Sequence, residues 1–143
     1  MQWLQEAEKR KDEMVQSLCQ WLKINSVHDA TTVGEGAPFG KGVKEAIEYI
    51  VDLAEKDGFA TVNEAGYACH IDYGQGDKIV GILGHVDLVP EGDGWKYPPY
   101  SATIADGRIY ARGTLDDKGP MMAAYFAVKI IRDLGLPISK KIR

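Results

Sequence analysis

Cysteine and long apolar runs are both scarce in this sequence of 143 residues. Its two cysteines, Cys19 and Cys69, form no Cys-x-x-Cys pair, which argues against a disulfide framework or a cysteine-ligated zinc site. We expect both to be small buried hydrophobic residues in a protein of the reducing cytoplasm. No apolar run approaches the roughly 18 residues that would suggest a membrane span. The N-terminus also lacks the basic and apolar segments of a signal peptide.

An excess of positive charge is missing as well. Seventeen lysines and arginines stand against 21 aspartates and glutamates, which gives a net charge of -4. This balance argues against a nucleic-acid partner, and the lack of a membrane segment argues against a membrane partner. The hydrophobic content of 45% and charged content of 27% are ordinary for a globular protein with a real core. The length suits one domain, or one fragment of a larger one.

Three helices are predicted from the spacing of apolar residues. Such residues recur at three- and four-residue steps over 2–23 and 43–57, which is typical of amphipathic helices. Gly58 is expected to end the second of them as a C-cap. A third helix is predicted over 118–134, and its almost uniformly apolar stretch at 121–131 indicates a helix buried in the domain.

The strands are predicted from a change of period. Residues 59–63, 67–73 and 78–84 read as strands between turns, and the third is apolar on both faces. That pattern favours a central strand covered by helices on both sides. Asp106-Gly107 predicts a tight hairpin between two further strands. The order of helices and strands therefore predicts the α/β class, specifically a three-layer α/β/α sandwich.

Two chemistry-bearing side chains stand at predicted strand ends. His85 follows the third strand, and Asp116 follows residues 108–115 and opens the last helix. Ligands of such sheets bind at the carboxyl ends of the strands, so we expect both side chains at one edge. An imidazole and a carboxylate there can share a zinc or manganese ion. Asp87 is the candidate to orient the His85 ring, and Asp117 to cap the helix or make a structural hydrogen bond.

Two longer motifs contain these residues. Residues 84–95 read Gly-His-Val-Asp-Leu-Val-Pro-Glu-Gly-Asp-Gly-Trp, and residues 110–120 read Tyr-Ala-Arg-Gly-Thr-Leu-Asp-Asp-Lys-Gly-Pro. Together they resemble the N-terminal signatures of the co-catalytic metallopeptidases that include aminoacylase, carboxypeptidase G, carnosinase and the bacterial PepV-type dipeptidases. The Asp-Asp-Lys-Gly-Pro form is similar to the dipeptidase and carnosinase branch. The resemblance covers essentially the whole chain.

The resemblance implies hydrolysis of a dipeptide by water held between two divalent metal ions, zinc or manganese. It implies that His85 ligates one ion and that Asp116 bridges both. Asp87 takes a catalytic role by orienting His85 and tuning the basicity of its ring. A glutamate is the general base of that reaction. The resemblance further implies a cis peptide bond between Asp116 and Asp117.

Several parts of that family's site have no counterpart in residues 1–143. These are the general-base glutamate, the metal-binding glutamate beside it, another acidic ligand, a distal histidine and the lid domain. We therefore interpret residues 1–143 as the N-terminal portion of the catalytic domain, with the lid domain and the C-terminal half of that domain absent. The metal site is expected to be incomplete and the chain inactive alone. Exposed sheet edges and helix faces predict self-association.

Two alternatives remain. The first is an N-acyl amino acid deacylase or desuccinylase of the same family, which the Asp-Asp-Lys-Gly-Pro form disfavours, since deacylases more often carry Gly-Ala-x-Asp-Met-Lys-Gly. The second is a non-enzymatic module that binds a metal or another ligand through the same sheet edge. A chain that ends at Arg143 in the gene and is stable and monodisperse would favour the second.

Overall fold

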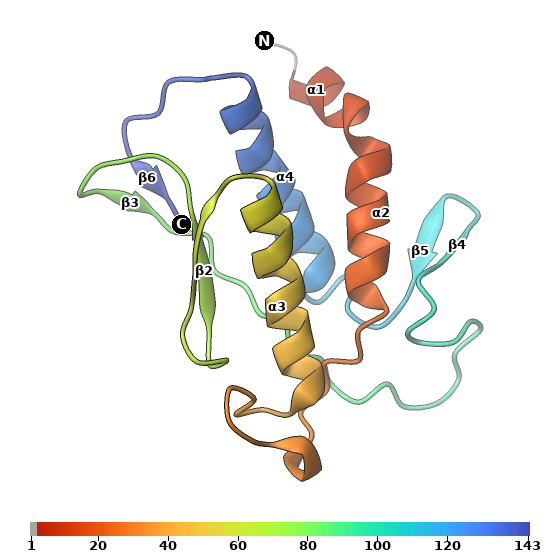
Figure 1. Ribbon diagram of the computed structural model, residues 1–143. Helices are drawn as coiled ribbons and strands as arrows, with labels where there is room; N and C mark the ends of the chain where they lie inside the picture. Colours follow the sequence, from red (N-terminus) through yellow and green to blue (C-terminus); the bar gives the residue numbers. More distant parts are fainter. Residues whose placement is uncertain (1–2) are drawn as a thin grey trace.

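The computed structural model describes residues 3–143, and it combines helices with short strands (Figure 1). The helices are α1 (Trp3–Lys9), α2 (Lys11–Leu22), α3 (Lys41–Lys56) and α4 (Lys118–Asp133), with a 3-10 turn η1 at Ala30–Thr32. The strands are β1 (Ala60–Asn63), β2 (Cys69–Asp72), β3 (Ile79–Val80), β4 (Thr103–Ala105), β5 (Arg108–Tyr110) and β6 (Lys141–Ile142). The predicted α/β class is confirmed.

The helices largely follow the predicted ranges. The helix predicted over 2–23 begins with a residue outside the described part, and the rest divides at Arg10 into α1 and α2. The guanidinium of Arg10 lies 3.2 Å from the Glu6 carboxylate and 3.5 Å from that of Asp133, which ties the division to the end of α4. The C-cap of α3 is Asp57 rather than the predicted Gly58, which follows it with a φ of 81° and ends the helix in the left-handed conformation. Within residues 3–143, no helix is long and apolar enough to cross a membrane.

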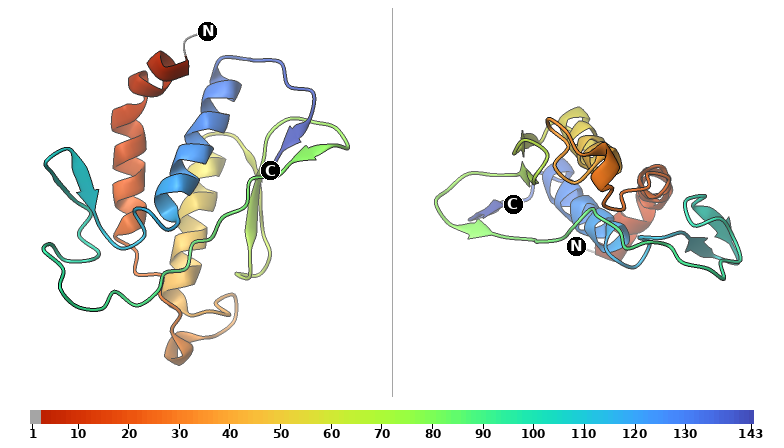
Figure 2. Two further views of the ribbon diagram at one scale, coloured as in Figure 1. Left: turned by 180° about the vertical axis from the view of Figure 1, so that it is seen from behind. Right: turned by 90° about the horizontal axis from the view of Figure 1, so that it is seen from below.

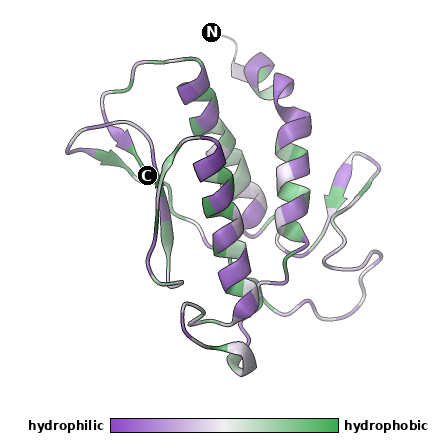
Figure 3. Ribbon diagram, in the orientation of Figure 1, coloured by the Kyte–Doolittle hydropathy of each residue, from purple (hydrophilic) through white to green (hydrophobic). Residues whose placement is uncertain are grey.

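The core lies where α2, α3 and α4 stand side by side (Figures 1 and 2). Apolar residues alternate with hydrophilic ones along α2 and α3, so each helix keeps a polar outer face (Figure 3). Trp21 is fully buried and donates a hydrogen bond from Nε1 to the carbonyl of Ala46 at 2.9 Å, which joins α2 to α3. Cys19 and Cys69 are free thiols beside this core, and they are partly rather than fully buried.

The strands of the described residues form three two-stranded sheets. β1 and β2 are antiparallel and pack on α3, whereas β3 and β6 are parallel. β4 and β5 are antiparallel and project beyond α2 on the other side of the molecule (Figure 1). Their turn is Asp106-Gly107, with φ values of 52° and 70°, so the predicted hairpin is confirmed.

The strand predicted over 78–84 differs most from expectation. Only Ile79–Val80 forms a strand, and it is exposed rather than buried, as is Leu83, whose side chain is 99% accessible. The prediction was wrong about burial because an apolar sequence can be covered only where another layer packs on it. In the described part of the chain, β3 contacts mainly β6, and the helices pack elsewhere.

Candidate metal centre

The first half of the site lies at the start of the long segment between β3 and β4. This segment crosses the helices from the β3 side of the molecule to the β5 side (Figure 2). The hydroxyl of the fully buried Ser26 donates to the carbonyl of Val86 at 2.6 Å. The N–H of Leu88 donates to the carbonyl of Ser26 at 3.1 Å. The loop that follows α2 therefore fixes the backbone on both sides of Asp87.

The second half of the site lies at the start of α4, against the residue that precedes His85. A β-carbon at Gly84 would collide with the sulfur of Met121 and lie 2.5 Å from a carboxylate oxygen of Asp117. Glycine therefore allows the close approach of this backbone to α4, and a larger residue would displace the side chains of Met121 and Asp117. The N–H of His85 donates to Oδ2 of Asp117 at 3.2 Å.

Asp117 occupies the N-cap position of α4, but its side chain accepts no hydrogen bond from the helix. Asp117 was predicted either to cap the helix or to make a structural hydrogen bond. The structure shows the hydrogen bond, which it accepts from the N–H of His85. The peptide bond between Asp116 and Asp117 is cis, as the resemblance implied.

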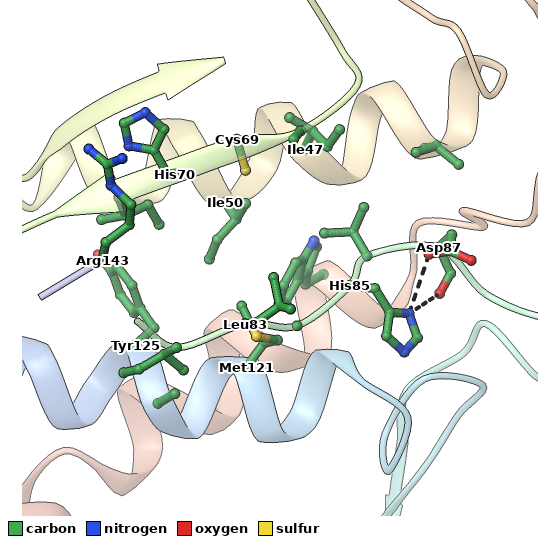
Figure 4. Close-up of a pocket in the computed structure, with 18 of the residues that line it drawn as sticks. Ile47, Ile50, Cys69, His70, Leu83, His85, Asp87, Met121, Tyr125 and Arg143 are labelled. Carbon is green, nitrogen blue, oxygen red and sulfur yellow. Dashed lines mark hydrogen bonds and ion pairs between the residues drawn. The ribbon is translucent and has the colours of Figure 1, made fainter. Parts of the chain in front are cut away.

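The three predicted site residues come together. Nε2 of His85 lies 2.9 Å from Oδ1 of Asp116, across 31 positions of sequence. Nδ1 of the same ring lies 3.1 Å from the carbonyl of Asp87 and 3.3 Å from its carboxylate, and Figure 4 shows this ring turned toward Asp87. A proton on Nδ1 donates to Asp87, and the contact of Nε2 with the Asp116 carboxylate is a hydrogen bond when Nε2 carries a proton, whose place a cation could take. All three side chains are solvent-accessible, with exposures of 46%, 63% and 79% for His85, Asp87 and Asp116.

The two aspartates also change the acidity of the histidine. Partial burial lowers the pKa of His85, but the Asp116 carboxylate and the Asp87 carbonyl raise it by more, so its pKa lies above the ordinary value. The site therefore attracts positive charge to Nε2. A proton and a metal ion would compete for this position, because a metal needs the neutral imidazole.

Sequence reasoning missed one residue that holds this arrangement. Lys118 is fully buried, and its Nζ donates to the carbonyls of Trp21 at 3.1 Å and Ile24 at 2.9 Å. The carbonyl of Trp21 also accepts from the N–H of Ile24 at 3.2 Å, whereas the carbonyl of Ile24, just beyond the end of α2, accepts from no backbone N–H of the described residues. Burial lowers the pKa of Lys118 to about 8. Its place directly after the two aspartates, before a buried helix, was the available signal.

Lys118 and Ser26 together give the site a shared support. Lys118 follows the Asp116 half of the site, and Ser26 fastens the His85 half. Ser26 lies in the short loop after α2, and Lys118 donates to Ile24 of the same loop. Two motifs that are far apart in the sequence are therefore anchored on one segment.

The described residues do not complete a metal site. Within residues 3–143, no group of three or more histidine, cysteine, aspartate or glutamate side chains is placed to hold a metal ion. His85 and Asp116 can offer one nitrogen and one carboxylate to a cation, while Asp87 lies behind the ring.

Comparison with known proteins confirms the resemblance. Residues 81–143 match the model of the peptidase family M20/M25/M40. The chain is 51% identical over 143 residues to YtjP of Bacillus subtilis (strain 168), which is named as a predicted dipeptidase. That match covers all of this chain and 31% of YtjP. A protein of Staphylococcus aureus (strain USA300), also named as a predicted dipeptidase, is 41% identical over 140 residues, which cover 98% of this chain and 30% of that protein.

Solved structures agree in fold. Human carnosine dipeptidase 1 matches with a TM-score of 0.72 and 26% identity, over 96% of this chain and 32% of that one. An M20 family metallo-carboxypeptidase of Sulfolobus solfataricus matches with a TM-score of 0.67 and 28% identity, over 91% and 29% of the two chains. This chain thus spans about a third of the length of the relatives it matches. It resembles M20 peptidases, and its curated relatives are named as dipeptidases.

Proposed function

We propose that this chain is part of the catalytic domain of a metal-dependent dipeptidase, in which His85 and Asp116 contribute ligands to divalent metal ions. One observation carries the proposal: Nε2 of His85 meets a carboxylate oxygen of Asp116 at 2.9 Å while Asp87 engages the other ring nitrogen. The names of the curated relatives and the fold of human carnosine dipeptidase 1 support the dipeptidase class.

The donor set fits a divalent cation of the zinc or manganese type. Imidazole nitrogen suits zinc, and carboxylate oxygen is accepted by both metals. Both donors are open to solvent, so an ion can reach them without unfolding. A catalytic zinc normally needs about three protein ligands and a water. Because the described residues offer two, we propose that the 143-residue chain binds metal weakly and is inactive alone.

A bound divalent ion would lower the pKa of a water and polarise the scissile carbonyl of a dipeptide substrate. Three aspartates of this chain would orient or support the ligands of such an ion. Asp87 would keep the proton of His85 on Nδ1, so that Nε2 would be available to hold an ion. Asp116 brings negative charge that offsets the charge of the cations. Asp117 holds the backbone of His85 and so maintains the spacing between the two donors.

Manganese provides a direct test, because its unpaired electrons broaden the NMR signals of nearby nuclei. Substoichiometric Mn²⁺ should broaden the amide signals of residues 84–87 and 116–118 before others. His85→Gln should abolish this local broadening. His70→Gln is the matched control, because His70 lies in β2 and pairs with Asp72. Broadening that is unchanged in His85→Gln, or centred elsewhere, contradicts the proposed ligand.

The reaction is tested separately. The 143-residue chain with added Mn²⁺ or Zn²⁺ should show no dipeptide hydrolysis, and turnover equal to that of an intact relative would overturn its proposed inactivity. Intact YtjP should hydrolyse a dipeptide faster than an N-acylated amino acid. The reverse preference would favour the deacylase alternative for proteins that share these motifs.

A further inference from the structure

Residues 88–115, the connecting segment, leave the candidate metal centre and return to it. They follow Asp87, form the long loop and the β4–β5 hairpin beyond α2, and come back at Asp116 (Figure 1). His85 and Asp116 are therefore 31 positions apart in sequence, although their side chains meet at 2.9 Å. A long connection fixes the distance between its ends poorly, because the chain between them has many conformations. The separation of the two side chains therefore depends on contacts that close the connecting segment near the site.

Arg112 closes the connecting segment close to both of its ends. Its Nη2 donates to the carbonyl of Glu91 at 3.0 Å, across 21 positions of sequence. Its guanidinium carbon lies 5.2 Å from the centre of the Trp95 ring, and Nε1 of Trp95 donates to the same carbonyl at 2.9 Å. The hydroxyl of Tyr100 donates to the Glu91 carboxylate at 2.8 Å. Glu91, Trp95 and Arg112 thus form one cluster, which we call the neck.

The neck uses a property that is particular to arginine. A planar guanidinium can lie over an indole ring and donate a hydrogen bond from its edge at the same time. Nε of Arg112 is buried and has no hydrogen-bond partner among the described residues. The carbonyl of Glu91 and the ring of Trp95 are therefore the contacts that hold the guanidinium. A lysine would keep the charge, but its compact ammonium does not reproduce both contacts.

With the neck closed, only residues 88–90 and 113–115 separate it from the two site aspartates, and the first of these connections is stiff. Leu88 is buried, with 4% of its surface exposed, and its N–H donates to the carbonyl of Ser26 at 3.1 Å. Pro90 has a restricted φ. A displacement of Glu91 is therefore passed along a short, constrained backbone toward Asp87.

The second connection is stiff as well, and it touches the first. The carbonyl of Gly113 accepts from the N–H of Gly119 at 3.3 Å, which folds residues 113–119 back on themselves around Asp116. Gly113 has a φ of 91°, and a β-carbon there would lie 2.8 Å from Cδ2 of Leu88. The backbone before Asp116 therefore packs directly on the residue after Asp87.

We propose that Arg112 is a positioning residue of the candidate metal centre, and that by closing the neck it fixes the separation of His85 and Asp116 for a shared divalent cation. Arg112 makes no contact with either side chain and acts through residues 88–90 and 113–115. This role deepens the proposed function and rests on it.

Metal binding by the 143-residue chain tests the role, with Mn²⁺ alone as the probe. In the unaltered chain, the amides of residues 84–87 and 116–118 should broaden over one range of Mn²⁺ concentration. In Arg112→Met this shared broadening should need about tenfold more Mn²⁺, the order of loss seen when the supports of metal ligands are removed. Arg108→Met, at an exposed position of β5, is the matched control and should leave the range unchanged.

Both substitutions remove one positive charge, which by itself would favour a cation, so weaker binding in Arg112→Met reports lost geometry. Arg112→Lys, which keeps the charge, should also weaken binding because it loses the contacts of the neck. The same Mn²⁺ dependence in Arg112→Met, Arg108→Met and the unaltered chain would overturn the proposal.

Amide hydrogen exchange without metal gives a second readout. The N–H of His85 donates to Asp117 and so reports directly on the contact between the two halves of the site. In Arg112→Met this amide should exchange about threefold faster or more, while the amides inside α2 and α4 keep their rates. Equal acceleration at His85 and throughout both helices would mean that Arg112 stabilises the whole domain, and would contradict a positioning role.

The two readouts also separate this proposal from the proposed function. If the unaltered chain shows no local Mn²⁺ broadening, the proposed metal ligands are wrong, whereas exchange at His85 still decides whether Arg112 holds the two halves together. If the unaltered chain binds Mn²⁺ locally and Arg112→Met binds it equally well, only the positioning role is wrong.

A milder variant keeps the test decisive if Arg112→Met does not fold. Trp95→Leu removes the ring beneath the guanidinium and should raise the required Mn²⁺ in the same direction by a smaller factor. Tyr97→Leu is the control from the same loop, because Tyr97 contacts Tyr110 rather than Arg112. Equal Mn²⁺ dependence in these two variants would contradict the role of the neck.

The path from the neck to the site is tested at two glycines. Gly113→Ala would displace the buried side chain of Leu88, whereas a β-carbon at Gly107 meets nothing within 4 Å. Both positions have a positive φ, of 91° and 70°, so the backbone strain of the two substitutions is similar. Gly113→Ala should weaken Mn²⁺ binding more than Gly107→Ala does. An equal effect of the two substitutions would contradict transmission through Leu88.

Discussion

β2, which reads Cys-His-Ile-Asp, and the segment at 79–83, which reads Ile-Val-Gly-Ile-Leu, were both predicted to lie in strands, yet they have different environments. Every residue of β2 is partly buried, between β1 and the flank of α3. Both residues of β3 are exposed, and Leu83 beyond it is exposed almost completely. The second stretch is the more apolar of the two in sequence. An apolar sequence favours burial of a strand, but the elements that pack beside the strand decide whether it is buried.

The largest expected difference in unfolding free energy is between truncating a buried apolar side chain and truncating an exposed one. Met122→Ala removes a fully buried side chain from the helical core and should lower the free energy of unfolding by roughly 2–5 kcal/mol. Leu83→Ala should change it by less than about 0.5 kcal/mol, because this side chain is already in water. Urea denaturation followed by circular dichroism measures both. A large loss for Leu83→Ala would mean that the open segment is covered in solution, for example by self-association.

The next contrast concerns the anchor between the core and the site. Lys118→Met leaves the carbonyl of Ile24 without a donor and that of Trp21 with the N–H of Ile24 alone, and it should cost about 1–3 kcal/mol of unfolding free energy. Lys56→Met, at the exposed end of α3, is the matched control and should be near neutral. If the two substitutions cost the same, the buried ammonium does not stabilise the junction.

The smallest contrast lies where the closed and open regions meet. Arg143 makes two hydrogen bonds of 2.7 Å to the Asp72 carboxylate and lowers the pKa of that carboxyl to about 2. A lowered folded-state pKa contributes stability above the unfolded pKa of about 3.9, and that stability is lost as pH falls toward 2. Asp72→Asn should therefore cost about 1 kcal/mol at pH 6, after allowance for solvent screening, and progressively less below pH 4.

Denaturation at several pH values measures this difference, with Asp77→Asn in the turn before β3 as the control. A cost for Asp72→Asn that does not change between pH 6 and pH 2 would contradict an ionic contribution. Because this ion pair joins the end of β2 to the residue after β6, the same measurement reports how firmly the two strands are linked.

Much of the fold was predictable because it depends on local pattern. The repeat of apolar residues in α3, the turn at Asp106-Gly107 and the left-handed glycine at Gly58 that ends α3 all appear where the sequence places them. The site was predictable in part, because His85 and Asp116 lie in sequence motifs that indicate metal ligands. The role of Lys118 was not predicted, since its partners are backbone carbonyls about a hundred residues away.

The sequence alone determined the helices, the hairpin and the identity of the candidate ligands, because periodicity, turn preferences and side-chain chemistry act over a few residues. Tertiary structure decided what depends on distant parts of the chain. It set the 2.9 Å approach of His85 to Asp116, the shared anchor at residues 24–26 and the exposure of residues 79–83. Each of these needs segments far apart in sequence to meet, and no local pattern encodes which neighbour a segment will have.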